Sequence, residues 1–411
     1  MRTVPDLVRL SWRYLWSRPL VALLNLLLLA LGLAAITLVL LVATQLDAAF
    51  ERDLNGIDLV VGAKGSPLQL ILAGVFHIDV PTGNIPLQEV QALRNDPLVA
   101  QIIPLSMGDS YRGRRIVGTT PDYVAHYHAT LAQGRMWQEP MEAVLGASVL
   151  RTMADAAPDG AALLGARFIG SHGLGEGGHA HGEHPYRITG VLAPCGCVLD
   201  RLILTATESV WRVHEAATAD DPGDLEILAQ EREVTVALVR YRSPLAAATL
   251  PRRINSDTAL QAAAPAVEIS RLLRLLGLGA DVLRAFGGVL LAVAVLSVFI
   301  ALCNAVRERR ADLAMLRMLG APPRRVAGLL LCEALWLAAL ACALGLLLGH
   351  ALAHGLGRVL QAQGLLPVSG LLWLPAEAGL PLLAGALAAF AALLPSVLAY
   401  RTDVAELLSQ P

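Results

Sequence analysis

The chain has 411 residues, of which 55% are hydrophobic and 16% charged, and its formal net charge is -2. Soluble domains carry about a quarter charged residues, so this composition argues against a soluble enzyme. The near-neutral net charge gives no indication of nucleic-acid binding. The hydrophobic residues fall in long runs separated by polar stretches, which indicates an integral membrane protein.

Residues 1–18 place aromatic and leucine side chains among arginines, for example Trp12 and Trp16 on either side of Arg13. This pattern predicts an amphipathic helix that lies in the inner membrane interface, with its aromatic rings at headgroup level. We expect the helix to turn through an elbow into the first membrane span.

Four apolar runs are long enough to cross a bilayer, which takes about 20 helical residues. A single run of this kind can be a buried core helix, but four of full length predict a membrane protein. The first run is too long for the apolar part of a signal peptide and lacks a convincing cleavage site, so we expect it to remain as an anchor. The predicted spans are 19–45, 285–305, 326–350 and 378–399.

Arginine residues flank these spans mainly on one side. They precede the first span and crowd the link between the second and third, whereas the link between the third and fourth has only Arg358. The positive-inside rule therefore places both termini, including the tail 400–411, and the loop 306–325 in the cytoplasm. Residues 46–284 and the loop 351–377 are then expected on the outer side.

Residues 46–268 have the mixed pattern of an α+β domain, which is large enough to form two lobes. Residues 269–284 have apolar side chains at helical spacing and lead directly into the second span, so we expect a stalk helix continuous with it. The predicted strands are 57–61, 115–119, 186–192, 201–205 and 234–241. The predicted helices are 87–94, 141–153, 208–215 and 244–254.

A glycine- and histidine-rich loop occupies residues 170–184 of this outer segment, and its composition predicts flexibility. Neutral imidazole is a good ligand for borderline metals, so the loop is a candidate site for zinc, nickel or copper. Two other interpretations stay open, namely a solvated insertion without a specific role and a pH-responsive segment. The candidate ligands are His172, His179, His181 and His184.

Cys195 and Cys197 flank Gly196 in the same outer segment, on the side of the membrane where disulfides persist. Gly196 would permit the tight turn that joins the two sulfur atoms in a short-loop disulfide. Two unlinked thiols, or a soft metal pair with the nearby histidines, are the alternatives. The three remaining cysteines lie within or at the ends of predicted spans, where we expect them to act as small apolar side chains.

Glu333 is the charged residue of the third predicted span. An ionisable residue inside a span is a functional candidate by default. Glu333 lies near the inner end, however, within reach of Arg324 or Arg325, so we favour a structural ion pair or cap over a substrate or proton site.

Two spaced motifs lie towards the outer end of the same span. Gly345 and Gly349 form a G-x-x-x-G motif, which permits close helix packing and is a candidate seam between two copies of the chain. His350 and His354 are four residues apart and share a helix face. Two histidines without a neighbouring carboxylate are a weak signal for a metal site.

The sequence lacks the phosphate-binding pattern G-x-x-x-x-G-K-[ST], so ATP binding of that kind must belong to another polypeptide. It also lacks the patterns H-E-x-x-H and G-x-S-x-G and a credible catalytic triad. We therefore expect a non-catalytic membrane subunit that binds no cofactor directly, apart from the metal that the histidine-rich loop could hold.

The most specific motif lies in the loop 306–325, which reads VRERRADLAMLRMLGAPPRR. It resembles the stretch R-x-x-E-x-A-x-L-R-x-x-G-A of FtsX/MacB-type (type VII) ABC transporter permeases, with an aspartate where a glutamate is usual. Phrases at 60–72, 77–86, 115–120 and 190–201 resemble a branch of that family with no assigned substrate. The resemblance implies a site that couples to an ATPase, formed by Arg309, Asp312, Leu313, Leu316, Arg317, Gly320 and Ala321.

The resemblance also implies the architecture, partners and location. The fold would be a membrane α-helical protein with four transmembrane helices and an inserted α+β domain resembling the MacB periplasmic core domain. A cytoplasmic LolD/MacB-type ATPase dimer, which binds ATP and Mg²⁺, would grip two copies of the permease through the loop 306–325. The chain would reside in the bacterial inner membrane, with a periplasmic protein as a further candidate partner.

The function implied is mechanical, because ATP hydrolysis in the partner would move the outer domain and drive export or extraction of a substrate. An alternative of another class is a transmembrane regulator or sensor that controls an outer partner, such as a cell-wall hydrolase, without moving cargo. The sequence leaves the choice of substrate open.

Overall fold

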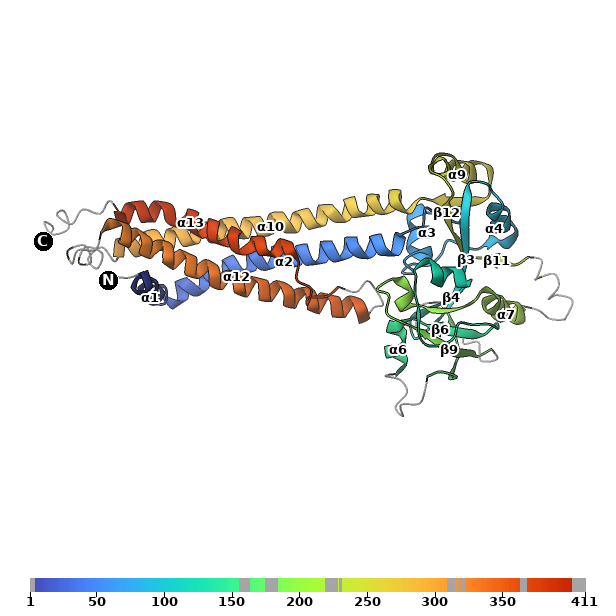
Figure 1. The fold of residues 1–411 in the computed structure, drawn as a ribbon. Coiled ribbons are helices and arrows are strands. Elements are labelled where there is room, and N and C mark those ends of the chain that lie inside the picture. Colours follow the sequence, from blue (N-terminus) through green and yellow to red (C-terminus); the bar gives the residue numbers. More distant parts are fainter. Residues whose placement is uncertain are drawn as a thin grey trace. The chain divides into compact units, whose positions relative to one another are not determined.

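The computed structural model describes residues 4–154, 163–173, 184–218, 228, 231–308, 315, 318, 322–362 and 368–400. The chain divides into two compact units (Figure 1). A helical unit comprises Met1–Leu46 and Leu275–Pro411, and an α+β unit comprises Asp47–Arg274. Each unit is described by itself below.

The helical unit contains helices that are long and apolar enough to cross a membrane, and the described residues include four of them. Proline occupies the first position of α2, α10 and α12, where its missing N–H is not needed for a helical hydrogen bond. The helices are α1 (Val4–Leu15), α2 (Pro19–Leu54), α10 (Pro265–Glu308), α12 (Pro323–Ala362), the 3-10 turn η2 (Pro375–Ala378) and α13 (Gly379–Tyr400).

A shared apolar core joins these helices. Leu33 of α2, Ala294 of α10, Ala341 of α12 and Ala392 of α13 are all fully buried in it. The short amphipathic helix α1 packs on α12, where the rings of Trp12 and Trp336 lie 5.0 Å apart. Small residues at the contacts let the backbones approach closely, as is usual for helices packed in a membrane.

The G-x-x-x-G motif is used for packing within the chain. A Cβ atom on Gly345 would lie 2.9 Å from the carbonyl oxygen of Ala30, and one on Gly349 would lie 2.6 Å from Cβ of Thr37. Both neighbours belong to α2. The prediction that this motif forms the seam between two copies is therefore wrong, because α2 already covers that face.

Three long helices extend past the bounds expected from the sequence. α2 runs 36 residues to Leu54, beyond the expected span end at residue 45, and α10 runs 44 residues from Pro265. α12 continues to Ala362, past the expected end at residue 350. Charged residues end an apolar run, but they do not end a helix, so the helices continue where the hydrophobic pattern stops.

The α+β unit is built on a mixed sheet with strand order β13-β1-β12-β3-β4-β10-β6-β9-β5, to which β7 and β8 add at β9 and β3. A two-stranded sheet pairs β11 with β2. The strands are β1 (Leu59–Ala63), β2 (Ile85–Pro86), β3 (Val99–Tyr111), β4 (Arg114–Thr119), β5 (Leu131–Gly134), β6 (Glu142–Leu145), β7 (Arg167–Phe168), β8 (Ser171–His172), β9 (Tyr186–Leu192), β10 (Ile203–Ala206), β11 (Glu233–Val234), β12 (Val236–Tyr241) and β13 (Leu260–Ala263).

The strand β3 joins the two lobes of this unit. Its first half pairs with β12, and its second half pairs with β4. One apolar core includes Leu59 and Val239, and a second core includes Ile116 and Leu145. The covering helices are α3 (Pro67–Gly74), α4 (Leu87–Arg94), α5 (Pro121–His126), α6 (Ala147–Ala154), η1 (Val198–Arg201), α7 (Thr207–Thr218) and α9 (Pro244–Asp257).

One predicted helix of this unit is wrong in its first part. Residues 141–153 contain the strand β6 followed by α6, with Gly146 between them. All four residues of β6 are buried, because the strand lies between β10 and β9 and is covered on both faces. A short strand buried on both faces has no alternating pattern and cannot be told from a helical segment by periodicity.

Candidate functional site

The predicted ATPase-coupling residues fall in the segment between α10 and α12. Arg309, Asp312, Leu313, Leu316, Arg317, Gly320 and Ala321 all lie outside the described residues. Two described positions of the same segment, Met315 and Met318, are helical and are 55% and 57% exposed. The ATPase-coupling role of these residues therefore stays a prediction.

Glu333 lies on α12 and is buried at 7% exposure. It lines a small cavity of about 50 Å³ together with Tyr14, Arg18 and Asn25. The arginine at this cavity thus comes from the segment between α1 and α2, whereas Arg324 and Arg325 are exposed. An arginine, a tyrosine and an asparagine around a buried carboxylate favour a structural role for Glu333, as expected for charges inside a membrane protein.

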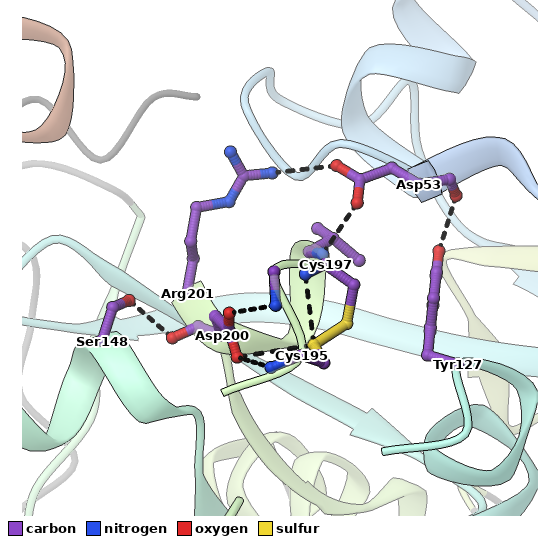
Figure 2. The surroundings of a disulfide bond; sticks show 9 residues. Asp53, Tyr127, Ser148, Cys195, Cys197, Asp200 and Arg201 are labelled. Atoms are coloured by element: carbon purple, nitrogen blue, oxygen red, sulfur yellow. Dashed lines mark hydrogen bonds and ion pairs between the residues drawn. A yellow bond between two sulfur atoms is a disulfide. The ribbon is translucent and has the colours of Figure 1, made fainter. Parts of the chain in front are cut away.

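The clearest site in the α+β unit is the joint where the last turn of α2 meets a disulfide-closed turn (Figure 2). Asp53 is 3% exposed and accepts a hydrogen bond of 2.9 Å from the backbone N–H of Val198. Its second carboxylate oxygen lies 3.6 Å from the guanidinium of Arg201. The Tyr127 hydroxyl donates to the backbone carbonyl of Asp53 at 2.7 Å.

The disulfide links Cys195 and Cys197, whose Cα atoms are 5.2 Å apart. Gly196 between them has φ of +67°, a left-handed conformation that glycine adopts without steric cost. The carboxylate of Asp200 closes the turn by accepting from the backbone N–H groups of Cys195 and Gly196, at 3.0 and 2.8 Å. The structure therefore has the two sulfurs bonded to each other in a rigid turn.

Aromatic packing strengthens the same joint. Phe50, one turn before Asp53 on α2, is buried at 5% exposure, and its ring lies 4.9 Å from that of Phe76.

The ion pair of Asp53 and Arg201 is also largely buried. Arg201 has a side chain only 11% exposed, and burial lowers its pKa while the nearby Asp53 opposes that shift. Removing Asp53 would leave a buried guanidinium without its facing carboxylate, which is costly.

A buried polar cluster lies beside this joint and connects two of the phrases that carry the family resemblance. His77, in the phrase 77–86, contacts the Tyr123 hydroxyl through Nε2 at 3.0 Å. Arg115, in the phrase 115–120, donates to the backbone carbonyl of Asp79 at 2.8 Å. The backbone of the first phrase and the buried Arg115 of the second are thus held together by a direct hydrogen bond.

The predicted metal ligands are partly outside the described residues, since His179 and His181 are not described. His172 lies on β8, and the structure brings it beside Asp109 of β3 and His214 of α7. Asp109 and His214 were not predicted from the sequence. They are far apart in the chain and belong to no spaced motif, so only the sheet register reveals their proximity to His172.

The histidine pair at the outer part of α12 is divided by the fold. The ring of His350 contacts the backbone carbonyl of Gly370 at 2.7 Å and a carboxylate oxygen of Glu377 at 2.9 Å. His350 thus fastens the segment before α13 to α12, whereas His354 is exposed. Both ring nitrogens of His350 are used in this contact, which favours a structural role over an H-x-x-x-H metal site.

Models of two known protein families match this chain. Residues 22–257 match the model of the MacB-like periplasmic core domain, and residues 284–404 match the FtsX-like permease C-terminal model. Comparison with curated proteins gives no match.

Two solved structures resemble the chain at low identity. The periplasmic region of MacB from Actinobacillus actinomycetemcomitans is 13% identical with a TM-score of 0.35, and the match covers 54% of this chain and 95% of that one. The extracellular domain of the noncanonic ABC-type transporter YknZ from Gram-positive bacteria is 14% identical with a TM-score of 0.29, and the match covers 50% of this chain and 98% of that one.

The family models account for the architecture described above. The first covers more than half of the chain, from the first span through the α+β unit, and the second covers the three remaining spans. The chain is thus a multi-pass membrane protein with a periplasmic or extracellular domain, and it belongs to the FtsX/MacB-type permease family of ABC transporters.

Proposed function

We propose that this chain is the permease subunit that converts ATP hydrolysis by a separate cytoplasmic ATPase dimer into a conformational change of its α+β unit, and so drives export or extraction of a substrate. The observation that carries the proposal is the continuity of α2 and α10. Each is one unbroken helix that contains a membrane span and also contributes residues to the α+β unit.

The lengths of these helices exceed what a span needs. At about 1.5 Å per residue, the 44 residues of α10 extend about 66 Å, roughly twice the hydrocarbon thickness of a bilayer. A helix resists bending and stretching far better than a loop does. Displacement of the inner end of α10 or α2 would therefore pass along the helix to the α+β unit.

The contacts at the end of α2 support transmission of such a displacement. Asp53 contacts both the disulfide-closed turn and Arg201, and Phe50 packs on Phe76. At the start of α10, Ile269 is buried at 3% exposure. These contacts tie both helices to the folded interior of the α+β unit rather than to a flexible surface loop.

Membership of the FtsX/MacB-type permease family of ABC transporters supports a partner ATPase, and residues 1–411 contain no G-x-x-x-x-G-K-[ST] pattern. The coupling segment is residues 306–325. If residues 307–319 form a helix, their leucines lie on one side and their arginines on the other, and such an amphipathic helix can seat in a groove on a partner. A nucleotide-bound ATPase dimer has two such grooves, which supports two permease copies related by a two-fold axis.

Charge reversal in the coupling segment tests the ATPase contact. We expect Leu316→Glu combined with Arg317→Glu to abolish co-purification with the co-expressed cognate ATPase and to remove its stimulation in nanodiscs. Arg358→Glu is a matched control, since it reverses an exposed arginine in the outer part of α12. Undiminished binding and stimulated turnover in the double variant would overturn the docking site.

Interruption of α2 tests the mechanical step separately. A Gly-Gly-Gly insertion between Leu46 and Asp47 should leave the stimulation of ATP hydrolysis intact. In the wild type we expect hydrogen exchange of the α+β unit to differ between the nucleotide-free and the ATP-trapped state, and the insertion should remove that difference. The same insertion at the turn of Arg112 and Gly113 should preserve that difference, because a Cβ on Gly113 would meet no atom within 4 Å. If the α2 insertion leaves the exchange difference unchanged, the helix does not carry the movement.

A further inference from the structure

We propose that Asp109, His172 and His214 form a zinc-binding site in the α+β unit. Each of the three side chains offers one ligand atom, and these atoms all lie within 4.8 Å of one another. The residues come from β3, β8 and α7, so the fold, rather than a flexible loop, positions them. The inference stands apart from the proposed transport function, because metal binding can be measured on the permease alone.

The pairing of β8 with β3 places the first two ligands. In the antiparallel register Asp109 lies directly opposite His172, and Ser110 lies opposite Ser171. Side chains directly opposite in such a pair project from the same face with Cβ atoms about 5 Å apart. The register of β3 with its other neighbour β4 shifts between Met107 and Ser110, and a shift of this kind re-aims the side chain within it, which here is Asp109.

A glycine makes room for the third ligand. Gly108 precedes Asp109, and a Cβ atom on it would lie 3.3 Å from Nε2 of His214. A side chain larger than hydrogen at position 108 would thus crowd the imidazole of α7. The rings of His172 and His214 lie with their centroids 5.0 Å apart, so both imidazoles reach the carboxylate of Asp109.

The distances suit tetrahedral coordination. With zinc–ligand bonds of 2.0–2.1 Å, two ligand atoms of a tetrahedral site lie about 3.3 Å apart. Nδ1 of His172 lies 3.2 Å from Oδ1 of Asp109, which already matches this separation. The remaining ligand atoms lie within 4.8 Å, so a side-chain adjustment on the order of 1 Å would complete the geometry.

The candidate ligands differ in their exposure to solvent. The side chain of Asp109 is 1% exposed, whereas that of His172 is 45% exposed. Asp109 therefore offers a ligand oxygen inside the protein, and the exposed His172 leaves a path for the ion from solvent. His214 lines a cavity of about 790 Å³ together with Trp211 and Glu215, which leaves space for a fourth ligand such as water.

The donor set favours zinc among common divalent ions. Two imidazole nitrogens and one carboxylate oxygen, with a fourth position open, form a recurrent zinc arrangement. Calcium and magnesium prefer six or more oxygen ligands, which this cluster does not offer. Histidine binds metal through its neutral imidazole, so metal binding releases any proton that either ring carries.

The test uses the full chain in nanodiscs at pH 7.4, titrated with Zn²⁺ against a fluorescent zinc chelator. We expect one Zn²⁺ per chain with a dissociation constant below about 1 μM, and affinity reduced more than about 100-fold in Asp109→Asn and in His214→Gln, since even loss of an outer partner costs 10–100-fold. Co²⁺ bound in place of Zn²⁺ should give the visible absorption of a four-coordinate site, and both variants should lose it.

Two controls make the outcome decisive. Asp122→Asn changes an exposed carboxylate in α5 and should bind zinc as the wild type does. A chain lacking residues 174–183 should also keep its zinc, because the three ligands lie outside that stretch. Zinc binding that is absent from the wild type, unchanged in both ligand variants, or lost only with residues 174–183 would overturn the site. Thermal unfolding without metal shows whether each variant is folded, and a folded variant of either ligand is sufficient.

Discussion

At the residue scale, the buried imidazole of His77 shows how the interior of the α+β unit depends on protonation. The residue is 7% exposed. Its backbone has φ of 55°, which is uncommon for a residue other than glycine. Burial lowers the pKa of His77 well below its usual value, and the positive charges of Arg115 and Arg201 act in the same direction. His77 is therefore neutral in the folded protein, with Nε2 facing the Tyr123 hydroxyl.

This lowered pKa predicts the pH dependence of stability. Below about pH 6.5 the unfolded chain binds a proton at His77 that the folded chain does not, so stability falls as the pH falls, by up to about 1.4 kcal/mol per pH unit. We expect His77→Gln to remove this component. Unfolding of the α+β unit, followed by hydrogen exchange between pH 7.5 and 5.5, measures the difference in slope, and equal slopes in the two proteins would contradict the assignment.

A second residue-scale prediction concerns Glu142, whose side chain is 7% exposed. Hydrogen bonds from the Arg135 guanidinium lower the pKa of Glu142 to about 2, and the backbone N–H of Gln138 contributes further. The stability that this pair adds is present above the ordinary carboxyl pKa and is lost as the pH falls towards 2. Glu142→Gln should lower the melting midpoint by about 2–4 °C at pH 7. The expected shift is kept this small because Arg135 is half exposed, so solvent screens the ion pair.

The matched control for this pair is Glu139→Gln, which neutralises an exposed carboxylate three residues away and should leave the midpoint nearly unchanged. The difference between Glu142→Gln and the wild type should shrink as the pH approaches 2. A constant difference over the acid range would mean that the ion pair is not its source.

Single residues also show where sequence reasoning reached its limit. His172 was a candidate ligand because the histidine-rich composition of its surroundings is visible in the sequence. Asp109 and His214 carry no such signal, since each is an isolated polar residue on a different element. Only the register of β8 on β3 and the absence of a side chain at Gly108 bring the three together.

At the element scale, apolar runs predict spans well because a bilayer demands their length and hydrophobicity. Strand β3 was not predicted at all, although it is the 13-residue strand that joins both lobes. Pro104 and Gly108 interrupt its β-branched pattern, and both residues normally argue against a central strand. The strand forms nonetheless, because β12 pairs with its first half and β4 pairs with its second half.

The contact of α12 with α2 gives a prediction about helix packing. A side chain at Gly345 would meet Cβ of Leu33 at 2.8 Å, so Gly345→Leu should force the helices apart and destabilise the helical unit by about 1–3 kcal/mol. Gly355→Leu lies on the same helix where a Cβ would meet no atom within 4 Å, and it should be tolerated. Thermal unfolding in detergent compares the two variants, and equal midpoints would show that α2 does not pack on Gly345.

At the scale of the whole molecule, two independent features determine the expected orientation in the membrane. The first is the distribution of arginines, which are dense between α10 and α12 and sparse between α12 and α13. The second is the disulfide of Cys195 and Cys197, which persists only in an oxidising compartment. The arginine distribution predicts that the coupling segment lies in the cytoplasm. The disulfide agrees with a periplasmic or extracellular α+β unit.

Labelling of single cysteines with a membrane-impermeant maleimide tests this orientation in a background where Cys303, Cys332 and Cys342 are replaced by alanine. Ser256→Cys, at an exposed position of α9, should react in intact spheroplasts. Met315→Cys, in the coupling segment, should react only after permeabilisation.

The native pair Cys195 and Cys197 provides an internal control in the same experiment. It should stay unlabelled until a reductant is added and should then react from outside, because reduction frees both thiols in the outer compartment. Reaction of Met315→Cys in intact spheroplasts would place the coupling segment outside, where ATP is not available to a partner ATPase, and would refute the proposed coupling together with the orientation. Labelling of Cys195 without reductant would leave the arginine argument intact and would remove only the disulfide, so the two features can fail separately.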